Sequence, residues 1–180
     1  MCLSWRMVRS VLWLGFLVGC GGSVDGVTKA PQDTGSTDIG CAPEVVIGTG
    51  EDAFLELPSG SELTMIHGPQ GGWHMLASVR VAGTSPEVHI QYEIVHEETG
   101  SLVSNNSYNL ALQMEDDCRG AYVGMYGILD IGPLVEGDLD TPPEILDGDL
   151  LRIRMDVQDV DFVQISGEVQ VVAARDPIDA

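Results

Sequence analysis

Short apolar runs, separated by clusters of Gly, Pro, Ser and Asp, recur along the chain from about residue 44 onward. In the clearest run, Leu151, Ile153, Met155 and Val157 alternate with polar side chains. This period of two is typical of a strand with one buried face and one wet face, and no window shows sustained helical spacing. The pattern predicts strands at 44–48, 53–57, 62–67, 73–82, 87–96, 107–114, 121–131, 149–157 and 162–173.

The last two predicted strands should form an antiparallel hairpin across residues 158–161. Ile165, Val169 and Val171 would then point inward, as the apolar positions of 149–157 do. Pairing about that turn places Arg152 opposite Glu168, and a slip of one residue would turn the apolar set to water.

Two further stretches depart from simple alternation. Residues 121–131 are apolar on both faces and contain Gly124 and Gly127, which predicts a central strand buried on both sides, with a bulge at one glycine. Residues 132–148 contain adjacent prolines and are predicted to be a long loop. Because binding residues concentrate on loops, we expect the working surface at 68–72 and 132–148.

The passage from Asp147 to Ile153, running into the final hairpin, resembles the last two strands of immunoglobulin-like and fibronectin-like domains in bacterial surface proteins. The resemblance covers roughly the last 30 residues of the sequence. Together with the strand pattern it implies an all-β fold, an antiparallel β-sandwich of immunoglobulin-like architecture, over residues 41–176.

The N-terminal segment has Arg6 and Arg9 before the apolar stretch 11–18, so residues 1–19 are predicted to be a signal peptide. Its last residues and the one after them, Leu17-Val18-Gly19-Cys20, resemble the lipobox of bacterial lipoproteins. The resemblance implies that Cys20 is acylated and that the protein is exported and anchored in the outer membrane, facing the periplasm or the cell surface. Residues 20–40 then form the lipidated cysteine and a polar tether.

The four cysteines divide accordingly. Cys2 leaves with the signal peptide and Cys20 carries lipid, so Cys41 and Cys118 remain as an even pair in an oxidising compartment. A disulfide between them is therefore predicted.

The net charge of the chain argues against one class of partner. With 28 acidic and eight basic residues, the formal net charge is −20, which repels phosphate backbones and argues against nucleic acid. The expected partners are the membrane, through the lipid anchor, and an unidentified protein or glycan.

A Gly- and His-containing stretch, His67-Gly68-Pro69-Gln70-Gly71-Gly72-Trp73-His74, suits a β-turn. It resembles a Gly-Pro-Gln-Gly-Gly loop of uncharacterised lipoproteins of Gram-negative bacteria. We treat His67, Gln70, Trp73 and His74 as a candidate ligand loop. If the flanking strands pair about it, His67 and His74 face each other, and zinc or copper could bind there, with His89 as a third ligand or Met65 or Met75 as a soft one.

Calcium is a second alternative cofactor, with Asp156, Asp159 and Asp161 as candidate ligands. Catalytic motifs are missing from the sequence, which has neither a Gly-x-Ser-x-Gly elbow nor a His-Glu-x-x-His pair. The sequence therefore favours a non-catalytic binding or structural module without a cofactor, ahead of a metal- or calcium-binding lipoprotein and, third, a secreted hydrolase.

Overall fold

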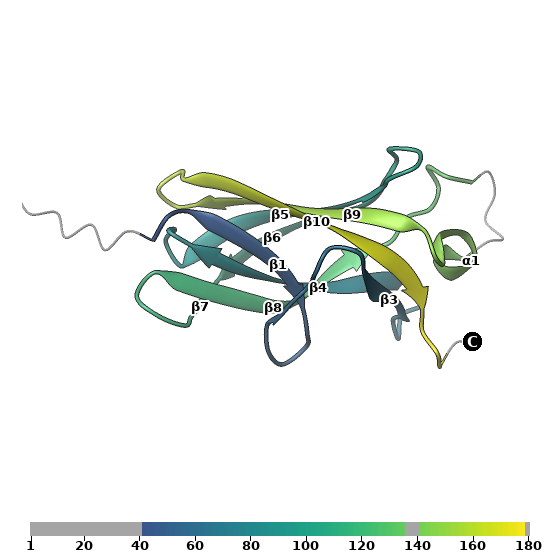
Figure 1. Cartoon of the computed structure of the whole chain (residues 1–180), viewed down its shortest axis with the longest axis horizontal. Coiled ribbons are helices and arrows are strands. Elements are labelled where there is room, and N and C mark those ends of the chain that lie inside the picture. The colour runs from purple at the N-terminus through teal and green to yellow at the C-terminus, as the bar shows by residue number, and fades with distance from the viewer. Residues whose placement is uncertain (1–40, 136–140, 179–180) are drawn as a thin grey trace, which may run out of the picture. The chain divides into compact units, whose positions relative to one another are not determined.

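A computed structural model describes residues 41–135 and 141–178 of the chain. The predicted signal peptide, tether and lipidation site at Cys20 lie outside the described residues. Within the described ranges the chain forms ten strands and one short helix (Figure 1). In chain order they are β1 (Glu44–Thr49), β2 (Leu55–Glu56), β3 (Ser61–His67), β4 (Trp73–Ala82), β5 (Glu87–His96), β6 (Leu102–Ala111), β7 (Gln113–Met114), β8 (Arg119–Ile128), α1 (Pro142–Leu146), β9 (Leu150–Asp159) and β10 (Gln164–Arg175).

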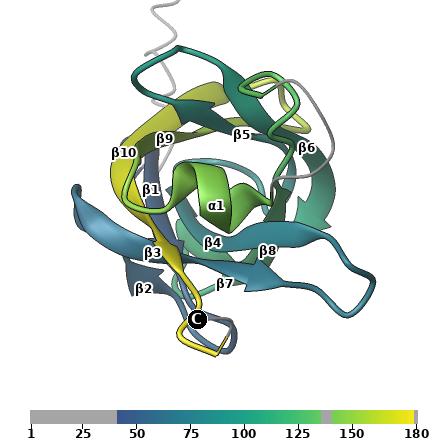
Figure 2. The same ribbon diagram turned by 90° about the vertical axis from the view of Figure 1, so that its right-hand side faces the viewer.

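The strands form one hydrogen-bonded sheet that curls into two facing layers. One layer has the order β6-β5-β9-β10, and β10 continues into the second layer by pairing in parallel with β3. β3 pairs with the first residues of β4, β1 pairs with the last residues of β4, and β8 lies on the other side of β4. The remaining strand pairs are antiparallel, so the predicted all-β antiparallel sandwich is confirmed. Seen end on, the strands surround the core as a ring (Figure 2).

The core consists of the inward stripes of these strands. Ile90, Tyr92 and Ile94 of β5 are fully buried, as are Leu151 and Ile153 of β9. Both stripes follow from the sequence alternation, because successive side chains of a strand point to opposite faces of the sheet. Four methionines are also buried in this core, namely Met155 of β9 and, from the second layer, Met65, Met75 and Met125.

The predicted disulfide between Cys41 and Cys118 is present, with Cα atoms 5.9 Å apart. It joins the segment that leads into β1 to the turn between β7 and β8. Gly83 passes between these segments, and its N–H donates to the Cys118 carbonyl at 3.0 Å. A Cβ at Gly83 would lie 2.7 Å from the Cys41 carbonyl oxygen, so only glycine fits beside the bridge.

The opposite end of the sandwich is closed by α1, which lies across the ring of strands (Figure 2). The sequence prediction of a structureless loop at 132–148 is wrong for this part, because two adjacent prolines suit the first turn of a helix, where their missing N–H groups are not needed. The N–H of Thr141 donates to the Glu144 carboxylate at 2.7 Å and fixes the start of the helix. Pro142, Pro143 and Leu146 are buried, and Leu146 has no exposed surface. No helix in the described ranges is long and apolar enough to cross a bilayer.

Several hydrogen bonds fasten α1 to the neighbouring strands. The N–H of Arg175 donates to the Asp147 carboxylate at 2.9 Å, and the Gly148 N–H donates to the Ala173 carbonyl at 2.8 Å. The buried imidazole of His96 lies between Thr99 Oγ1 at 2.9 Å and Asp149 Oδ2 at 3.1 Å. This end of the sandwich is therefore held by hydrogen bonds that surround the buried apolar residues of α1.

The final hairpin is formed as expected, but its register differs from the prediction by two residues. Arg152 lies opposite Gln170, and Glu168 lies opposite Arg154. The cause is the turn, in which Asp159 Oδ1 accepts hydrogen bonds from the N–H groups of Asp161 and Val163, both at 2.9 Å. Arg152 instead approaches Glu97 at 3.5 Å.

The bounds of several other strands also differ from the prediction: the expected strand at 107–114 is divided between β6 and β7, and β8 ends at Ile128 rather than at residue 131. β6 begins at Leu102 rather than at residue 107, because the polar run Ser104-Asn105-Asn106 pairs with β5 in spite of its low strand propensity. The long ladder with β5 outweighs that local preference.

We expect Leu146→Ala to destabilise the domain by about 2 to 5 kcal/mol, because it leaves a cavity between α1 and the core. Urea unfolding followed by circular dichroism measures the change in the free energy of unfolding. The matched control is Ile145→Ala, since Ile145 is only partly buried. Equal losses from the two variants would show that α1 does not seal the core.

Candidate functional site: the β6–β8 seam

The two histidines of the predicted ligand loop do not face each other, so that expectation is wrong. His67 pairs across the ladder with Trp73, whereas His74 pairs with Ile66. Since cross-strand partners share a face of the sheet and neighbours along a strand alternate, His67 and His74 lie on opposite faces. Their rings pack on different aromatics: His67 on Trp73, with centroids 4.8 Å apart, and His74 on Tyr126 at 4.7 Å.

The other candidate ligands are also engaged in separate contacts. His89 Nδ1 lies 2.9 Å from Asn109 Oδ1 on the outer face of the other layer. Asp156 pairs with Arg154 at 3.0 Å. Gln70 is exposed in the turn between β3 and β4, where the Gly71 N–H donates to the Gly68 carbonyl.

The three aspartates around the β9–β10 turn do not converge on one point. Asp159 is buried and serves the backbone, accepting from the N–H groups of Ser85, Asp161 and Val163, each at 2.9 Å. Asp161 accepts from the Ser85 hydroxyl at 2.8 Å. Within residues 41–135 and 141–178, no group of three His, Cys, Asp or Glu side chains is arranged to hold a metal ion.

The most distinctive feature of the described structure is the line along which the curled sheet fails to close. β6 pairs only with β5, and β8 pairs with β4 and, over Gly120 and Ala121, with β7. We call the line between β6 and β8 the seam. Among the described residues, one backbone hydrogen bond bridges it, from the Asp130 N–H just after β8 to the Val103 carbonyl at 2.7 Å.

Side chains of β6 bridge the rest of the seam. The Tyr108 hydroxyl donates to the Tyr126 carbonyl at 2.5 Å, and the Ile128 N–H donates to Asn106 Oδ1 at 3.0 Å. These contacts satisfy edge groups of β8 that a neighbouring strand would satisfy in a closed barrel. We call these two side-chain hydrogen bonds the staples. They hold β6 and β8 together along the seam in place of a backbone ladder.

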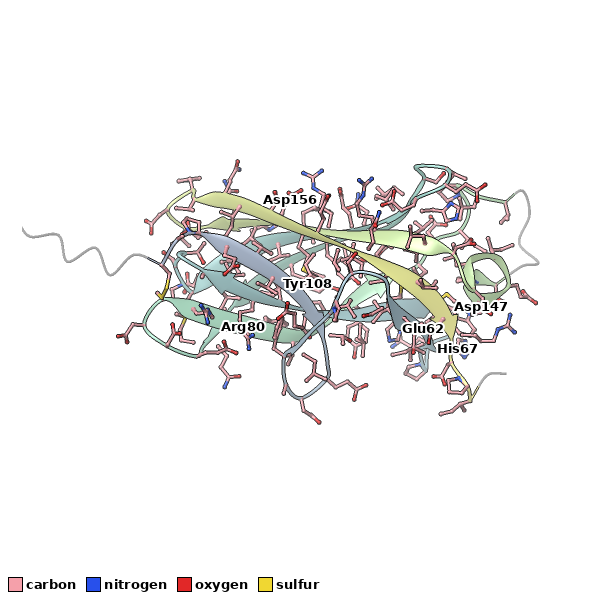
Figure 3. The ribbon with its side chains drawn as sticks, in the orientation of Figure 1. Glu62, His67, Arg80, Tyr108, Asp147 and Asp156 are labelled. Carbon is pink, nitrogen blue, oxygen red and sulfur yellow. A yellow bond between two sulfur atoms is a disulfide. The ribbon has the colours of Figure 1, made fainter. Side chains whose placement is uncertain are left out.

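All four tyrosines of the sequence gather at this seam, from the core outward. Tyr92 is fully buried, Tyr108 is partly buried, and Tyr122 and Tyr126 are 37% and 51% exposed. Burial and the neighbouring Tyr108 raise the pKa of Tyr92. Burial likewise raises the pKa of Tyr108. We call these four residues the tyrosine cluster; Figure 3 shows Tyr108 between the layers.

Glycines shape the cluster. A Cβ at Gly127 would lie 2.7 Å from the Tyr92 ring, so Tyr92 packs where only glycine leaves room. Gly124 has φ 73 and lies where the register between β4 and β8 shifts, which makes it the predicted bulge. The side chains on either side of this bulge, Tyr122 and Tyr126, are the exposed ones.

A groove of about 580 Å³ lies beside the seam, next to the pairing of β7 with β8. Its walls come from the end of β6, from β7, from β8 and from the segment before β2. The lining residues are Asp52, Ala53, Phe54, Ala111, Gln113, Met114, Glu115, Ala121, Tyr122 and Val123. Aromatic and small apolar surfaces with a few carboxylate and amide groups are typical of a ligand site.

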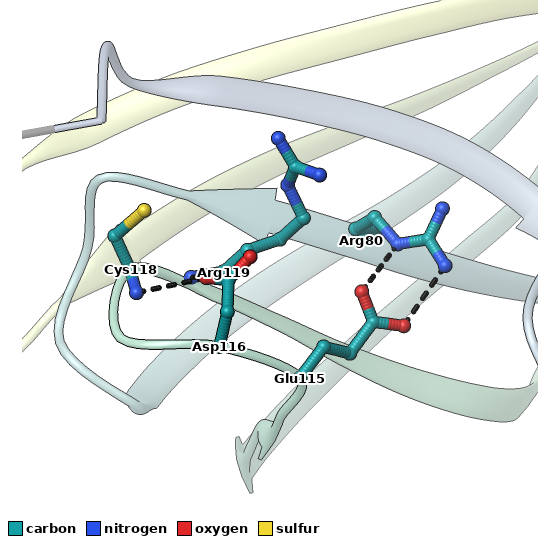
Figure 4. Close-up of polar contacts among 5 residues, drawn as sticks. All are labelled: Arg80, Glu115, Asp116, Cys118 and Arg119. Carbon is teal, nitrogen blue, oxygen red and sulfur yellow. Dashed lines mark hydrogen bonds and ion pairs between the residues drawn. The ribbon is translucent and has the colours of Figure 1, made fainter.

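Arg80 holds one wall of this groove in place. Its Nε and one terminal nitrogen donate to the two oxygens of Glu115 at 2.7 and 2.8 Å (Figure 4). Its guanidinium also lies 4.1 Å from the centre of the Phe54 ring. The hydrogen bond to Glu115 raises the pKa of Arg80, so its guanidinium keeps its charge in this two-pronged contact beside the groove.

The sequence prediction that residues 121–131 form a central strand buried on both sides is wrong. β8 is an edge strand, and Tyr122, Tyr126 and Ile128 are exposed. The signal that was present is the spacing of Tyr122, Gly124 and Tyr126, which alternates with Met125 and Gly127. Tyrosine and isoleucine count as apolar whether they are buried or exposed, so the sequence pattern alone does not distinguish this edge strand from a buried one.

Comparison with known proteins identifies no family. No family model matches the chain, and no curated protein sequence matches it. A solved structure of Bacteroides uniformis β-glucuronidase is 12% identical with a TM-score of 0.37, over 71% of this chain and 13% of that one. The CooA pilin subunit from enterotoxigenic Escherichia coli is 11% identical with a TM-score of 0.35, over 73% of this chain and 99% of the pilin. The chain thus spans only a small part of the β-glucuronidase, and likenesses this weak carry no argument about function.

We expect Asp159→Asn to destabilise the domain by about 1 kcal/mol near neutral pH, because an amide replaces a carboxylate that accepts three backbone N–H groups. Burial opposes ionisation, but the N–H groups of Ser85, Val163 and Asp161 together lower the pKa of Asp159 below its ordinary 3.8. The stabilisation is therefore complete above pH 3.8 and is lost as the pH falls through the lower native pKa.

Denaturant unfolding of both proteins between pH 7 and pH 2 tests this expectation. The difference between wild type and Asp159→Asn should shrink below pH 3.8. A difference that is constant over the whole range would mean that the charge of Asp159 is not involved.

Proposed function

We propose that the chain is an exported cell-envelope lipoprotein, held to the outer membrane by acyl chains on Cys20, and that it acts as a non-catalytic binding or structural module. The lipobox-like Leu17-Val18-Gly19-Cys20 supports the anchor. The bridge between Cys41 and Cys118 fits an oxidising compartment outside the cytoplasm.

The observation that carries the binding role is the tyrosine cluster beside an open groove. Tyrosine offers a large, stiff contact surface with a polar tip, and exposed tyrosines are enriched where proteins meet ligands. Tyr122 and Tyr126 project from an edge strand and are exposed, as are Ile128 on the same strand and Met114 on the neighbouring β7. Met114 and Tyr122 both line the groove.

The groove suits binding better than chemistry. Its side chains provide ring faces, a thioether, an amide and carboxylates, and its strongest polar pair, Arg80 with Glu115, is engaged internally. The partner in this proposal is a protein or a glycan in the envelope. The formal charge of −20 disfavours nucleic acid and anionic lipid surfaces as partners.

Cys20→Ala should abolish lipid attachment, because the thiol is the proposed acylation point. In cells fed an alkyne-bearing fatty acid, the wild-type chain should become labelled and fractionate with membranes, and the variant should remain unlabelled. Cys2→Ala is the matched control and should behave as wild type. Labelling of the Cys20→Ala variant, or mass spectrometry showing an intact signal segment on the wild-type chain, would contradict the anchor.

Tyr126→p-benzoylphenylalanine should cross-link to a partner in intact cells upon irradiation, because residue 126 projects from the proposed binding surface. The matched control, Ser166→p-benzoylphenylalanine, places the same group on the exposed face of β10. Adducts specific to position 126 support a binding role for the seam. Equal yields at both positions, or none at either, would contradict it.

A further inference from the structure

We infer that the open part of the seam takes up an extended polypeptide strand of a partner protein, one in which lysine or arginine alternates with apolar residues. The inference rests on the proposed binding role of the seam and names the partner's chemistry. It depends on three features of the groove: a free strand edge, a floor of small side chains, and a negative rim.

The strand edge is the first feature. β7 covers β8 only at Gly120 and Ala121, so among the described residues the stretch from Tyr122 to Met125 has no strand partner on the side that faces the seam. Within this stretch the Gly124 N–H is bound by Ser78 Oγ at 3.2 Å. An unpaired edge presents N–H and C=O groups at a regular spacing along the strand, which another extended chain matches. A sugar does not repeat donors and acceptors at the spacing of a strand, so this feature favours a polypeptide.

The staples show that β8 accepts partners on this edge. The Tyr126 carbonyl and the Ile128 N–H are bound by side chains of Tyr108 and Asn106, which occupy the places of a neighbouring backbone. Beyond Tyr126, toward Tyr122, the seam opens into the groove. The open edge therefore runs from Tyr122 to Met125, between β7 at one end and the side chains of β6 at the other.

The floor of the groove is the second feature. Ala111, Ala121 and Val123 line it with short side chains. At Gly124 a Cβ would meet only the Glu51 carbonyl, at 3.9 Å. Tyr122, Phe54 and Met114 also line the groove and offer apolar contacts for the side chains of an incoming strand.

The rim is the third feature. Asp52 and Glu115 line the groove, and Glu56 is near enough to raise the pKa of Arg80 together with Glu115. Arg80, which contacts this group, is already paired with Glu115. The local charge is negative in a chain of formal charge −20, so a partner strand with basic residues is complementary.

Three fluorescein-labelled decapeptides test the inference by fluorescence anisotropy against the detergent-solubilised full chain. The first alternates Lys with Val, the second replaces every Lys by Glu, and the third is the Lys–Val peptide with alternate backbone nitrogens methylated. Methylation keeps charge and side chains but removes the N–H groups that pair with a strand edge. We expect the Lys–Val peptide to bind and both other peptides to bind at least about tenfold more weakly.

Variants locate the binding. Tyr122→Ala should weaken the Lys–Val peptide about tenfold, as truncation of an aromatic contact does. Phe162→Ala is the matched control, because Phe162 is an exposed aromatic in the β9–β10 turn, 79% exposed. Circular dichroism melting checks that each variant folds, and if Tyr122→Ala does not, the methylated peptide against the wild-type chain decides the question.

Equal binding of the methylated and unmethylated peptides, or equal weakening by Tyr122→Ala and Phe162→Ala, would overturn the inference. Maltohexaose and chitohexaose are tested in parallel by competition and by the intrinsic fluorescence of the chain. Tyr122-dependent binding of a glycan without peptide binding would overturn the strand inference and leave the proposed binding role intact. If neither the peptide nor a glycan binds, and no cross-link forms at position 126, the proposed binding role itself is contradicted.

Discussion

The structure depends on sealing one apolar core with a sheet that curls around it but does not close. A closed barrel would satisfy every edge by backbone pairing, whereas here β6 and β8 meet along a seam. Tyr108 and Asn106 replace the missing ladder with side-chain hydrogen bonds to β8. The two ends of the ring need separate closures, which are the disulfide between Cys41 and Cys118 at one end and the buried Leu146 of α1 at the other. The seam is thus the least regular part of the enclosure.

The same irregularity explains why the seam is the best candidate for function. Side-chain staples release and re-form more easily than a continuous ladder, because each contributes only about 1 kcal/mol. Tyr92 anchors the cluster in the core, and Tyr122 and Tyr126 bring aromatic surface to the exterior beside a groove with an acidic rim. An edge strand with exposed aromatics is a liability in a free monomer and an advantage in a protein that receives a partner strand. A lipid anchor at Cys20, as proposed, would hold that edge close to envelope partners.

Much of the fold could be predicted from the sequence because period-two alternation reports directly which face of a strand is buried. The buried stripes of Ile90 to Ile94 and of Leu151 to Val157 are examples. The disulfide was predictable because Cys41 and Cys118 are the two cysteines that the expected signal peptide and lipidation site leave over. Other features depend on interactions that no local pattern encodes. The hairpin register was set by the backbone contacts of Asp159, and the placement of β8 at an edge was set by its distant neighbours β4 and β6. The seam could not be predicted for the same reason. Facing histidines at 67 and 74 would need a register between β3 and β4 that is shifted by one residue from the observed one, and the tyrosines have the pattern of core residues.

Native-state hydrogen exchange followed by NMR tests the central claim, that the sheet is unclosed along the seam, most directly. The amide of Tyr126 faces the seam if the staple to its carbonyl is as described, while the amides of Ile90 to Ile94 lie in the middle of a layer, between β6 and β9. Unpaired or side-chain-stapled edges open with small free energies, whereas central strands open only with global unfolding. The account predicts that the Tyr126 amide exchanges much faster than those of Ile90 and Ile94. Equal protection at all three positions would mean that β6 and β8 form a closed ladder, and the account would be wrong.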